Sequence, residues 1–210
     1  MIRILVADDH AVVRKGVKQI LAEVEDMTVI DEAQSGSETL QKIMEQEYDV
    51  VLLDISMPGR GGLEVLEDIK TLCPKLAVLI LTMHPEEQYA IRALRAGAKG
   101  YLTKASAPQE LIGAIRKVAG GGKYVTSSLA EKLADELEGV TDKLPHERLS
   151  NREHQVMLML AEGKSVSGVA DQLCLSVKTI STYRARVLSK MGMKKNAELT
   201  LYAVHNKLIN

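Results

Sequence analysis

Three acids, a threonine and a lysine in the first half of the chain have side chains suited to binding a metal ion and a phosphoryl group. The acids are Asp8, Asp9 and Asp54, and they are followed at longer spacing by Thr82 and Lys104. Three carboxylates held close together resist ionisation, and a hard divalent cation removes that conflict. Mg²⁺ prefers oxygen ligands and binds carboxylates together with phosphate. If the fold brings them together, Asp8, Asp9 and Asp54 form a magnesium site.

The same residues would support transfer of a phosphoryl group to a carboxylate. Asp54 is the candidate nucleophile, because carboxylates form aspartyl-phosphates in proteins. Lys104 would neutralise phosphoryl charge, and Thr82 would donate a hydrogen bond to a phosphoryl oxygen. Each residue taken alone could equally be a helix cap or a solvated charge. Their recurrence after short apolar runs favours one shared site over that alternative.

Alternating patterns predict the elements that must position these residues. The apolar runs are Ile2–Ala7, Thr28–Ala33, Val50–Leu53, Val78–Leu81 and Gly100–Leu102, and the helical patterns between them are Val12–Glu23, Ser37–Glu45, Gly62–Leu72, Glu86–Ala96 and Pro108–Val118. Runs made almost entirely of Ile, Leu and Val are typical of strands buried on both faces of a parallel sheet. We therefore predict a doubly wound α/β domain over residues 1–120, with a parallel five-stranded sheet whose strands end at one edge. No glycine-rich loop follows the first strand, which disfavours dinucleotide binding.

The formal net charge of −1 conceals an uneven distribution along the chain. Residues 1–125 and 126–145 each carry a net charge of −3, whereas residues 146–210 carry +5. An acidic front and a basic tail indicate two domains with different partners. Because the chain lacks Trp and Phe, base stacking is disfavoured, while groove binding by small and basic side chains remains open.

Residues 121–145 are predicted to be a linker that contains a short helix, Ser127–Leu137. Residues 146–210 are predicted to form an all-α domain with four helices. The first follows the N-cap Ser150 and ends near Ala161, the second follows Ser165, and the others span about Val177–Met191 and Asn196–His205. Two short helices joined by a tight turn, the second of them basic, indicate a helix-turn-helix over about residues 165–190.

The helix predicted for Val177–Met191 has one apolar and one polar face. Its apolar face carries Ile180, Val187, Leu188 and Met191. The candidate DNA-contacting residues are Lys178, Thr179, Ser181, Thr182, Tyr183, Ala185 and Arg186. Small residues allow close approach to base edges, and basic residues contact phosphates. The alternative is a solvated helix face, which the positive charge of the tail and the two-helix spacing make less favoured.

Several motifs give the chain a family resemblance. In the first half these are Asp8-Asp9-His10, Asp54-Ile55-Ser56-Met57-Pro58-Gly59, Leu81-Thr82 and Tyr101-Leu102-Thr103-Lys104, which resemble a two-component receiver domain with a flavodoxin-like fold. In the tail these are Leu149-Ser150-Asn151-Arg152-Glu153, Gly163-Lys164-Ser165, Val169-Ala170 and Leu175-Ser176-Val177-Lys178-Thr179-Ile180, which resemble a LuxR-type helix-turn-helix. Together they resemble a NarL/FixJ-family response regulator, with stretches most similar to its GacA/UvrY-like members. Arg184 stands where that pattern usually has an apolar residue.

The resemblance implies specific roles and partners. It implies that a sensor histidine kinase phosphorylates Asp54, with Mg²⁺ bound by Asp8 or Asp9, Asp54 and the backbone carbonyl of Ser56. It also implies a switch in which Thr82 and Tyr101 reorient. The implied product is a phosphorylation-switched transcription regulator that dimerises on paired half-sites of double-stranded DNA. It would be no enzyme beyond self-phosphorylation and autodephosphorylation.

Two alternatives remain open, and composition bounds the setting. A Mg²⁺-dependent phosphohydrolase would usually have a second acid two residues after the nucleophile, where Ser56 stands. An adaptor that has lost DNA binding is disfavoured by Lys178, Thr179 and Arg186. The apolar runs are too short to span a membrane. Cys73 and Cys174 form neither a metal-binding spacing nor a disulfide framework, which favours a reducing cytoplasm.

Overall fold

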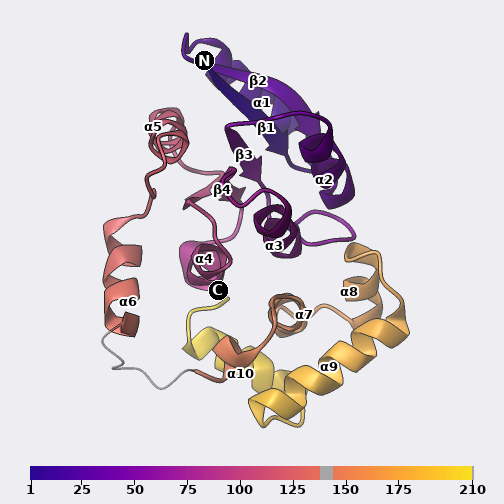
Figure 1. Ribbon diagram of the computed structural model, residues 1–210. Helices are drawn as coiled ribbons and strands as arrows, with labels where there is room; N and C mark the ends of the chain where they lie inside the picture. Colours follow the sequence, from indigo (N-terminus) through magenta and orange to yellow (C-terminus); the bar gives the residue numbers. More distant parts are fainter. Residues whose placement is uncertain (138–143, 210) are drawn as a thin grey trace. The chain divides into compact units, whose positions relative to one another are not determined.

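The computed structural model describes residues 1–137 and 144–209, and the chain divides into two compact units, Met1–Glu131 and Lys132–Asn210. Strands and helices alternate in the first unit, whereas the second is helical (Figure 1). This confirms the predicted combination of an α/β domain and an all-α domain. No helix in the described ranges is both long and apolar enough to cross a membrane.

The described residues of the first unit form a five-stranded parallel sheet in the order β2-β1-β3-β4-β5. The strands are β1 (Ile2–Ala7), β2 (Met27–Ala33), β3 (Val50–Leu53), β4 (Ala77–Thr82) and β5 (Gly100–Thr103). In the register, Ala7 pairs with Leu53 and Leu53 with Ile80. Because β1 lies between β2 and β3, the winding reverses there, and a doubly wound sheet binds its ligands at this point.

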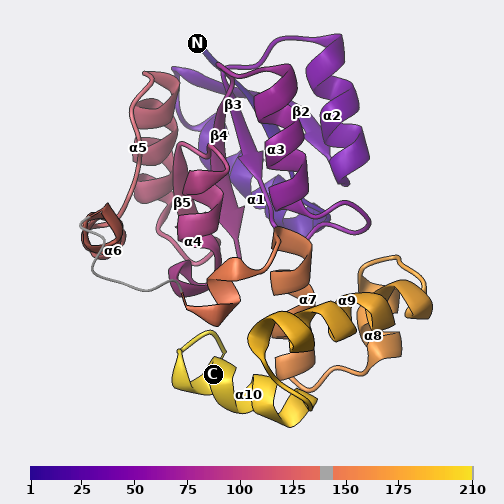
Figure 2. The same ribbon diagram turned by 60° about the horizontal axis from the view of Figure 1, so that its bottom comes forward.

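Helices cover both faces of the sheet. They are α1 (Ala11–Ala22), α2 (Gly36–Glu45), α3 (Gly62–Leu72), α4 (Glu86–Arg95) and α5 (Pro108–Ala119). Helices α1 and α5 share one core with Ile4, Leu52 and Leu79 of the strands, and α2, α3 and α4 lie on the opposite face (Figure 2). Burial on both faces explains why β3 and β4 are apolar almost throughout. Each strand and helix predicted for residues 1–120 begins and ends within one residue of its predicted position.

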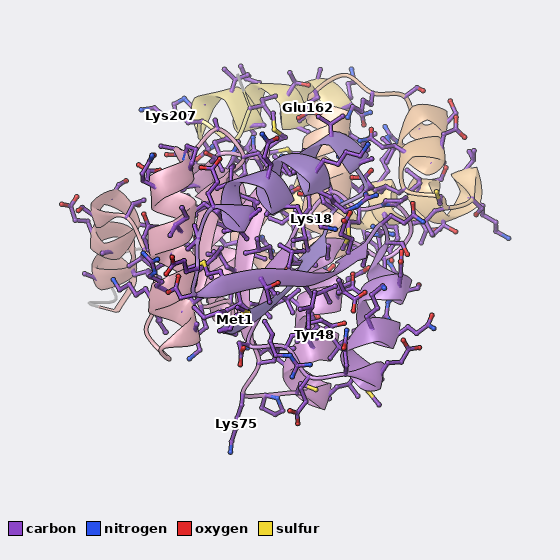
Figure 3. The ribbon with its side chains drawn as sticks, turned by 90° about the horizontal axis from the view of Figure 1, so that it is seen from above. Met1, Lys18, Tyr48, Lys75, Glu162 and Lys207 are labelled. Carbon is purple, nitrogen blue, oxygen red and sulfur yellow. The ribbon has the colours of Figure 1, made fainter. Side chains whose placement is uncertain are left out.

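Loops and the linker lie outside this core. Lys75 lies in the loop between α3 and β4, is exposed, and projects away from the sheet (Figure 3). The predicted helix of the linker is α6 (Ser127–Leu137), and the division between the two units falls within it. Residues 138–143 of the predicted linker lie outside the described residues.

The second unit is built around α7 (Asn151–Ala161), which packs on α8 (Val166–Gln172), α9 (Val177–Met191) and α10 (Asn196–His205). The predicted N-cap of α7 is present: Ser150 Oγ accepts a hydrogen bond from the Glu153 amide at 3.3 Å, and Glu153 Oε2 accepts one from the Ser150 amide at 2.8 Å. This reciprocal pair satisfies two amides that the first turn of a helix leaves without partners.

Two local features of this unit have clear physical causes. Cys174 adopts a positive φ of 52°, which turns the chain between α8 and α9, and Leu175 then donates to the Ala170 carbonyl at 2.9 Å. A short 3₁₀ helix that the sequence did not predict, η1 (Pro145–Arg148), begins at the last residue of the predicted linker and precedes α7. Its His146 is buried, and His146 Nδ1 lies 2.8 Å from the Tyr202 hydroxyl of α10.

Candidate functional site

The carboxyl edge of the sheet brings the predicted acids and lysine together. The amides of Asp8, Asp54 and Lys104 donate to carbonyls of neighbouring strands at 2.9, 2.9 and 2.7 Å. Each residue therefore continues the hydrogen-bond ladder one step past the end of its strand. This fixes the backbone of the three residues and directs their side chains toward one place.

Lys104 joins the two buried carboxylates. Its Nζ lies 2.7 Å from Asp8 Oδ2 and 2.8 Å from Asp54 Oδ2, and the three side chains are at most 5% exposed. Burial opposes the charged form of the lysine, but the hydrogen bonds and charges of Asp54 and Asp8 outweigh it and raise the pKa of Lys104. An ammonium held between two acids is suited to neutralising charge on a bound phosphoryl group.

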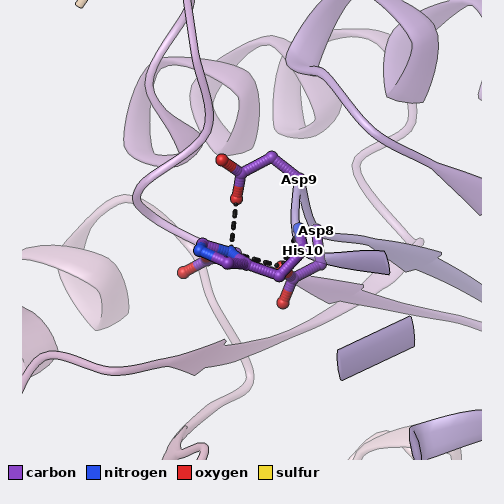
Figure 4. A group of neighbouring side chains, drawn as sticks. Asp8, Asp9 and His10 are labelled. Carbon is purple, nitrogen blue, oxygen red and sulfur yellow. Dashed lines mark hydrogen bonds and ion pairs between the residues drawn. The ribbon is translucent and has the colours of Figure 1, made fainter. Parts of the chain in front are cut away.

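The acids also form a cluster that could hold a cation. One ligand atom from each of Asp8, Asp9, His10 and Asp54 lies within 4.8 Å of the others. His10 Nδ1 lies 2.8 Å from Asp9 Oδ1 and 3.2 Å from Asp8 Oδ1 (Figure 4). The second oxygen of Asp54, Oδ1, is buried and has no hydrogen-bond partner among the described residues. Mg²⁺ prefers oxygen ligands, and here the carboxylates of Asp8 and Asp9 lie near that of Asp54, whose Oδ1 is available to bind it.

An arginine that the sequence did not single out supports the acidic turn. Arg14 of α1 donates to the backbone carbonyl of Asp8 at 2.7 Å and to Glu32 of β2 at 3.1 Å. Hydrogen bonds from Lys18 and Arg14 lower the pKa of Glu32 despite partial burial. The turn is thus held from both α1 and β2. Pairing between a helix and a strand far apart in sequence leaves no local pattern from which it could be predicted.

Thr82 and Tyr101, the predicted switch residues, are both fully buried. Thr82 Oγ1 has no hydrogen-bond partner among the residues the structure describes, so its hydroxyl can donate to an incoming ligand. The Tyr101 hydroxyl donates to the backbone carbonyl of His84 at 3.0 Å, and burial raises the pKa of Tyr101. Thr82 is the last residue of β4, and Tyr101 is the second residue of the neighbouring strand β5, where it pairs with Ile80.

Close packing of α3 positions the loop after Asp54. Gly62 begins α3, and its amide donates to the Ile55 carbonyl at 2.9 Å. A methyl group at Gly62 would lie 2.7 Å from Ile55 Cα and would also overlap the Asp54 backbone. Glycine is therefore required for this approach. Ser56, whose carbonyl was expected to bind the cation, lies on the same loop.

The second candidate site is the polar face of α9. Its apolar face is buried at Ile180, Val187, Leu188 and Met191, as predicted. Of the candidate DNA-contacting residues, Lys178, Ser181, Thr182, Ala185 and Arg186 are exposed, and Thr179 and Tyr183 are half-buried. Ser176 caps the helix by accepting from the Thr179 amide at 3.0 Å. A stable helix therefore presents small and basic side chains to solvent.

Side-chain contacts hold α9 against the rest of its unit. Lys190 Nζ lies 2.6 Å from Glu153 Oε2, an acid that is almost fully buried on α7. Arg184 Nε donates to Asn196 Oδ1 at the start of α10, at 2.7 Å. Arg184 therefore links α9 to α10, which accounts for a polar residue beside the apolar stripe.

Two protein families match this chain, one within each of its compact units. Residues 4–116 match the family described as the response regulator receiver domain. Residues 147–203 match the family described as bacterial regulatory proteins, luxR family. The first match contains the acidic edge of the sheet, and the second contains α7–α9 and most of α10.

Individual relatives match over the full length. Response regulator UvrY of Escherichia coli (strain K12) is 39% identical over 211 residues, which covers 100% of this chain and 97% of the relative. Response regulator GacA of Pseudomonas protegens is 39% identical and covers 100% and 99%. The RcsB response regulator of Salmonella typhimurium has a similar structure, with a TM-score of 0.74, 26% identity and 98% coverage of each chain. RcsB bound to the promoter rprA in the presence of the phosphomimetic BeF₃⁻ has a TM-score of 0.68 at 26% identity, with 97% and 99% coverage.

Proposed function

The chain belongs to the response regulators that join a receiver domain to a LuxR-type DNA-binding domain, and from that premise we propose which residues perform each activity. Members of this family regulate transcription by phosphorylation-dependent binding to DNA, and their receivers respond to histidine kinases. In this chain Asp54 is the phospho-acceptor. The observation that carries this assignment is its buried carboxylate: Oδ2 lies 2.8 Å from Lys104 Nζ, and Oδ1 has no hydrogen-bond partner within residues 1–137 and 144–209.

The proposed reaction is an in-line transfer. A carboxylate oxygen of Asp54 attacks the phosphorus of a kinase phosphohistidine, the O–P bond forms, and the N–P bond breaks with its electron pair left on the histidine nitrogen. Lys104 stabilises charge on the phosphoryl oxygens, and Thr82 donates a hydrogen bond to one of them. Asp8, Asp9, Asp54 and the carbonyl of Ser56 would hold Mg²⁺, which when bound neutralises the charge of the transferred group.

The receiver has limited chemistry of its own in this proposal. It accepts a phosphoryl group from a small acyl phosphate, and water hydrolyses its aspartyl-phosphate. The resulting charge draws the Thr82 hydroxyl toward the phosphoryl group, and Tyr101 rearranges with it. In this proposal, residues 1–120 form the receiver, residues 121–145 form the linker, and residues 146–210 form the DNA-binding domain.

The proposed DNA contacts lie on α9. Lys178 and Arg186 bind phosphates, and the smaller residues Ser181, Thr182 and Ala185 approach base edges in the major groove. Thr179 and Tyr183 contribute at the edge of this surface. Two copies would pair through α10, where Leu201 and Val204 are 74% and 49% exposed, and would bind paired half-sites. RcsB provides a structural precedent, described as two dimers bound to two parallel DNAs.

Labelling with a small acyl phosphate tests the phospho-acceptor. With acetyl phosphate and Mg²⁺, the parent should gain one phosphoryl group that hydroxylamine removes, as measured by intact-protein mass. Asp54→Asn should gain none, whereas Asp26→Asn, which removes an exposed acid paired with Arg116, should be labelled like the parent. Equal labelling of Asp54→Asn and the parent would refute the assignment. Steady turnover of a phosphomonoester would instead favour the phosphohydrolase alternative.

A further inference from the structure

The loop between β4 and α4 is tied by side chains to the loop that follows Asp54. Ser56 Oγ and His84 Nε2 lie 2.7 Å apart, which joins the residue two positions after Asp54 to the residue two positions after Thr82. The Tyr101 hydroxyl donates to the carbonyl of His84 at 3.0 Å. A change at Asp54 or Tyr101 therefore acts on the position of His84.

The ring of His84 is also fixed to the first turns of α4. Its Nδ1 lies 3.0 Å from Gln88 Oε1, and its centroid lies 4.8 Å from the Tyr89 ring at an interplanar angle of 59°. Pro85 lies between His84 and the first residue of α4, and its ring fixes φ near −66°. The backbone that joins His84 to α4 therefore has little torsional freedom. Movement of His84 is thus passed to the start of α4.

The start of α4 is in turn bonded to the linker. Glu86, the first residue of α4, accepts a hydrogen bond from Thr126 Oγ1 at 2.8 Å. The same hydroxyl accepts from the Leu129 amide at 3.2 Å and so caps α6. Leu129 is only 2% exposed, which anchors this part of α6 within the first unit. One threonine side chain therefore contacts both α4 and the linker helix.

The residues before Thr126 are held equally closely to the sheet. The Tyr124 amide donates to the Lys99 carbonyl at 2.7 Å, and Tyr124 forms a parallel bridge with Gly100 of β5. A methyl group at Gly100 would lie 2.7 Å from the Tyr124 carbonyl oxygen, so glycine permits this approach. The backbone just before the linker helix is therefore bonded to the edge strand β5, so the cap of α6 lies next to a segment that the sheet holds in place.

We propose that the Ser56–His84 and Glu86–Thr126 contacts form a relay that couples phosphorylation of Asp54 to the order of the linker at residues 124–131. This inference rests on the proposed role of Asp54. His84 and Thr126 are positioning residues in it, since neither reacts with the phosphoryl group. Rearrangement of Thr82 and Tyr101 moves the His84 backbone, and Glu86 then strengthens or releases its bond to the cap of α6. The chain continues from α6 toward the DNA-binding domain, so the linker receives the signal first.

Hydrogen–deuterium exchange of the full-length protein tests the relay, with beryllofluoride and Mg²⁺ as the probe of the phosphorylated state. In the parent, exchange at residues 124–131 should change by about fivefold on adding the probe, the effect of one hydrogen bond. Glu86→Ala and His84→Ala should reduce that change to less than about twofold. Binding of beryllofluoride at Asp54, followed by fluorine NMR, should persist in both variants.

Matched controls separate the relay from general loosening of the fold. Glu110→Ala removes the same charge from the first turn of another helix, α5, and should respond like the parent. Thr126→Ser keeps the hydroxyl and should also respond, whereas Thr126→Val should not. An unchanged response in Glu86→Ala and Thr126→Val would overturn the relay. So would a parent that binds beryllofluoride without any change at residues 124–131. A parent that binds no beryllofluoride and takes no phosphoryl group would instead refute the proposed function, and the relay with it.

Discussion

The acidic edge of the sheet and the polar face of α9 represent two different ways of presenting charged groups. At the sheet edge, Asp8, Asp54 and Lys104 are almost completely buried and contact one another at 2.7–2.8 Å. On α9, Lys178 and Arg186 are exposed. Phosphoryl transfer depends on groups that are preorganised away from water. Binding a DNA backbone depends on accessible cations that release counterions on contact.

The difference shows that burial separates two kinds of functional residue that look alike in sequence. Lys104 and Lys178 are both lysines close to threonines, yet the first is enclosed by two acids and the second lies on the surface. A buried charge depends on its partners for stability. An exposed charge has little influence on the fold and acts when a ligand arrives. The following four predictions test this contrast.

The largest expected effect is on stability at the sheet edge. Lys104→Ala leaves two buried carboxylates without their cation and should lower the free energy of unfolding by about 3 kcal/mol in metal-free buffer. Lys178→Ala, the exposed counterpart, should change it by less than about 0.5 kcal/mol. Urea unfolding followed by circular dichroism measures both. Equal effects in the two variants would remove the contrast.

The second prediction concerns packing beneath Asp54. Gly62→Ala would force a methyl group against the Asp54 and Ile55 backbone, and should cost about 2 kcal/mol of stability while slowing labelling by acetyl phosphate. Gly113→Ala in α5 is the matched control, because a methyl group there meets nothing within 4 Å. It should stabilise the protein by up to about 1 kcal/mol. A neutral Gly62→Ala would show that the loop can shift freely.

The third prediction concerns the exposed cations. Lys178→Ala should weaken binding to double-stranded DNA by about 1 kcal/mol and reduce the slope of log K against log salt by about 1. Titration of labelled genomic fragments at several salt concentrations gives both values. Lys207→Ala removes the same charge after α10 and should leave the slope unchanged. If both variants behaved alike, net charge rather than the α9 face would determine binding.

The smallest expected effect concerns pH. Burial raises the pKa of Glu153, but the Lys190 ammonium and the hydrogen bonds of Ser150 outweigh burial and lower it below its ordinary value of 4.5. Because the folded pKa lies below the unfolded one, the stabilisation is present above about pH 4.5 and is lost as the pH falls below it. Protection of α7 amides from hydrogen exchange should decline over that range in the parent. In Glu153→Gln that protection should depend less on pH.

Much of the fold was predictable because its signals are local. Strands buried on both faces are apolar throughout, as in Val50–Leu53, and the capping box at Ser150 and Glu153 marks the start of a helix within four residues. Parallel strands ending at one edge were sufficient to group Asp8, Asp54 and Lys104. The apolar face of α9 followed from helical spacing alone.

The contacts that could not be predicted join residues distant in sequence. Nothing in the sequence indicates that Arg14 reaches the Asp8 carbonyl, that His84 meets Ser56, or that Lys190 pairs with Glu153. The short helix η1 was missed because its four residues, Pro145–Arg148, are too few to show helical periodicity. These contacts depend on the directions in which folded elements project their side chains.

By itself, the sequence determined the succession of strands and helices along the chain, because hydrophobic periodicity is a local signal. It also determined the residue types at the sheet edge and the net charge of each half. Only the tertiary structure decided which oxygen of Asp54 is bonded to Lys104 and that Thr126 contacts both Glu86 and the linker helix. It also decided that the buried Thr82 hydroxyl has no partner in the part of the chain that the structure describes. The physical reason is that a hydrogen bond depends on distances of a few tenths of an ångström. Such distances are fixed only when the whole core packs and each strand takes its register against its neighbours.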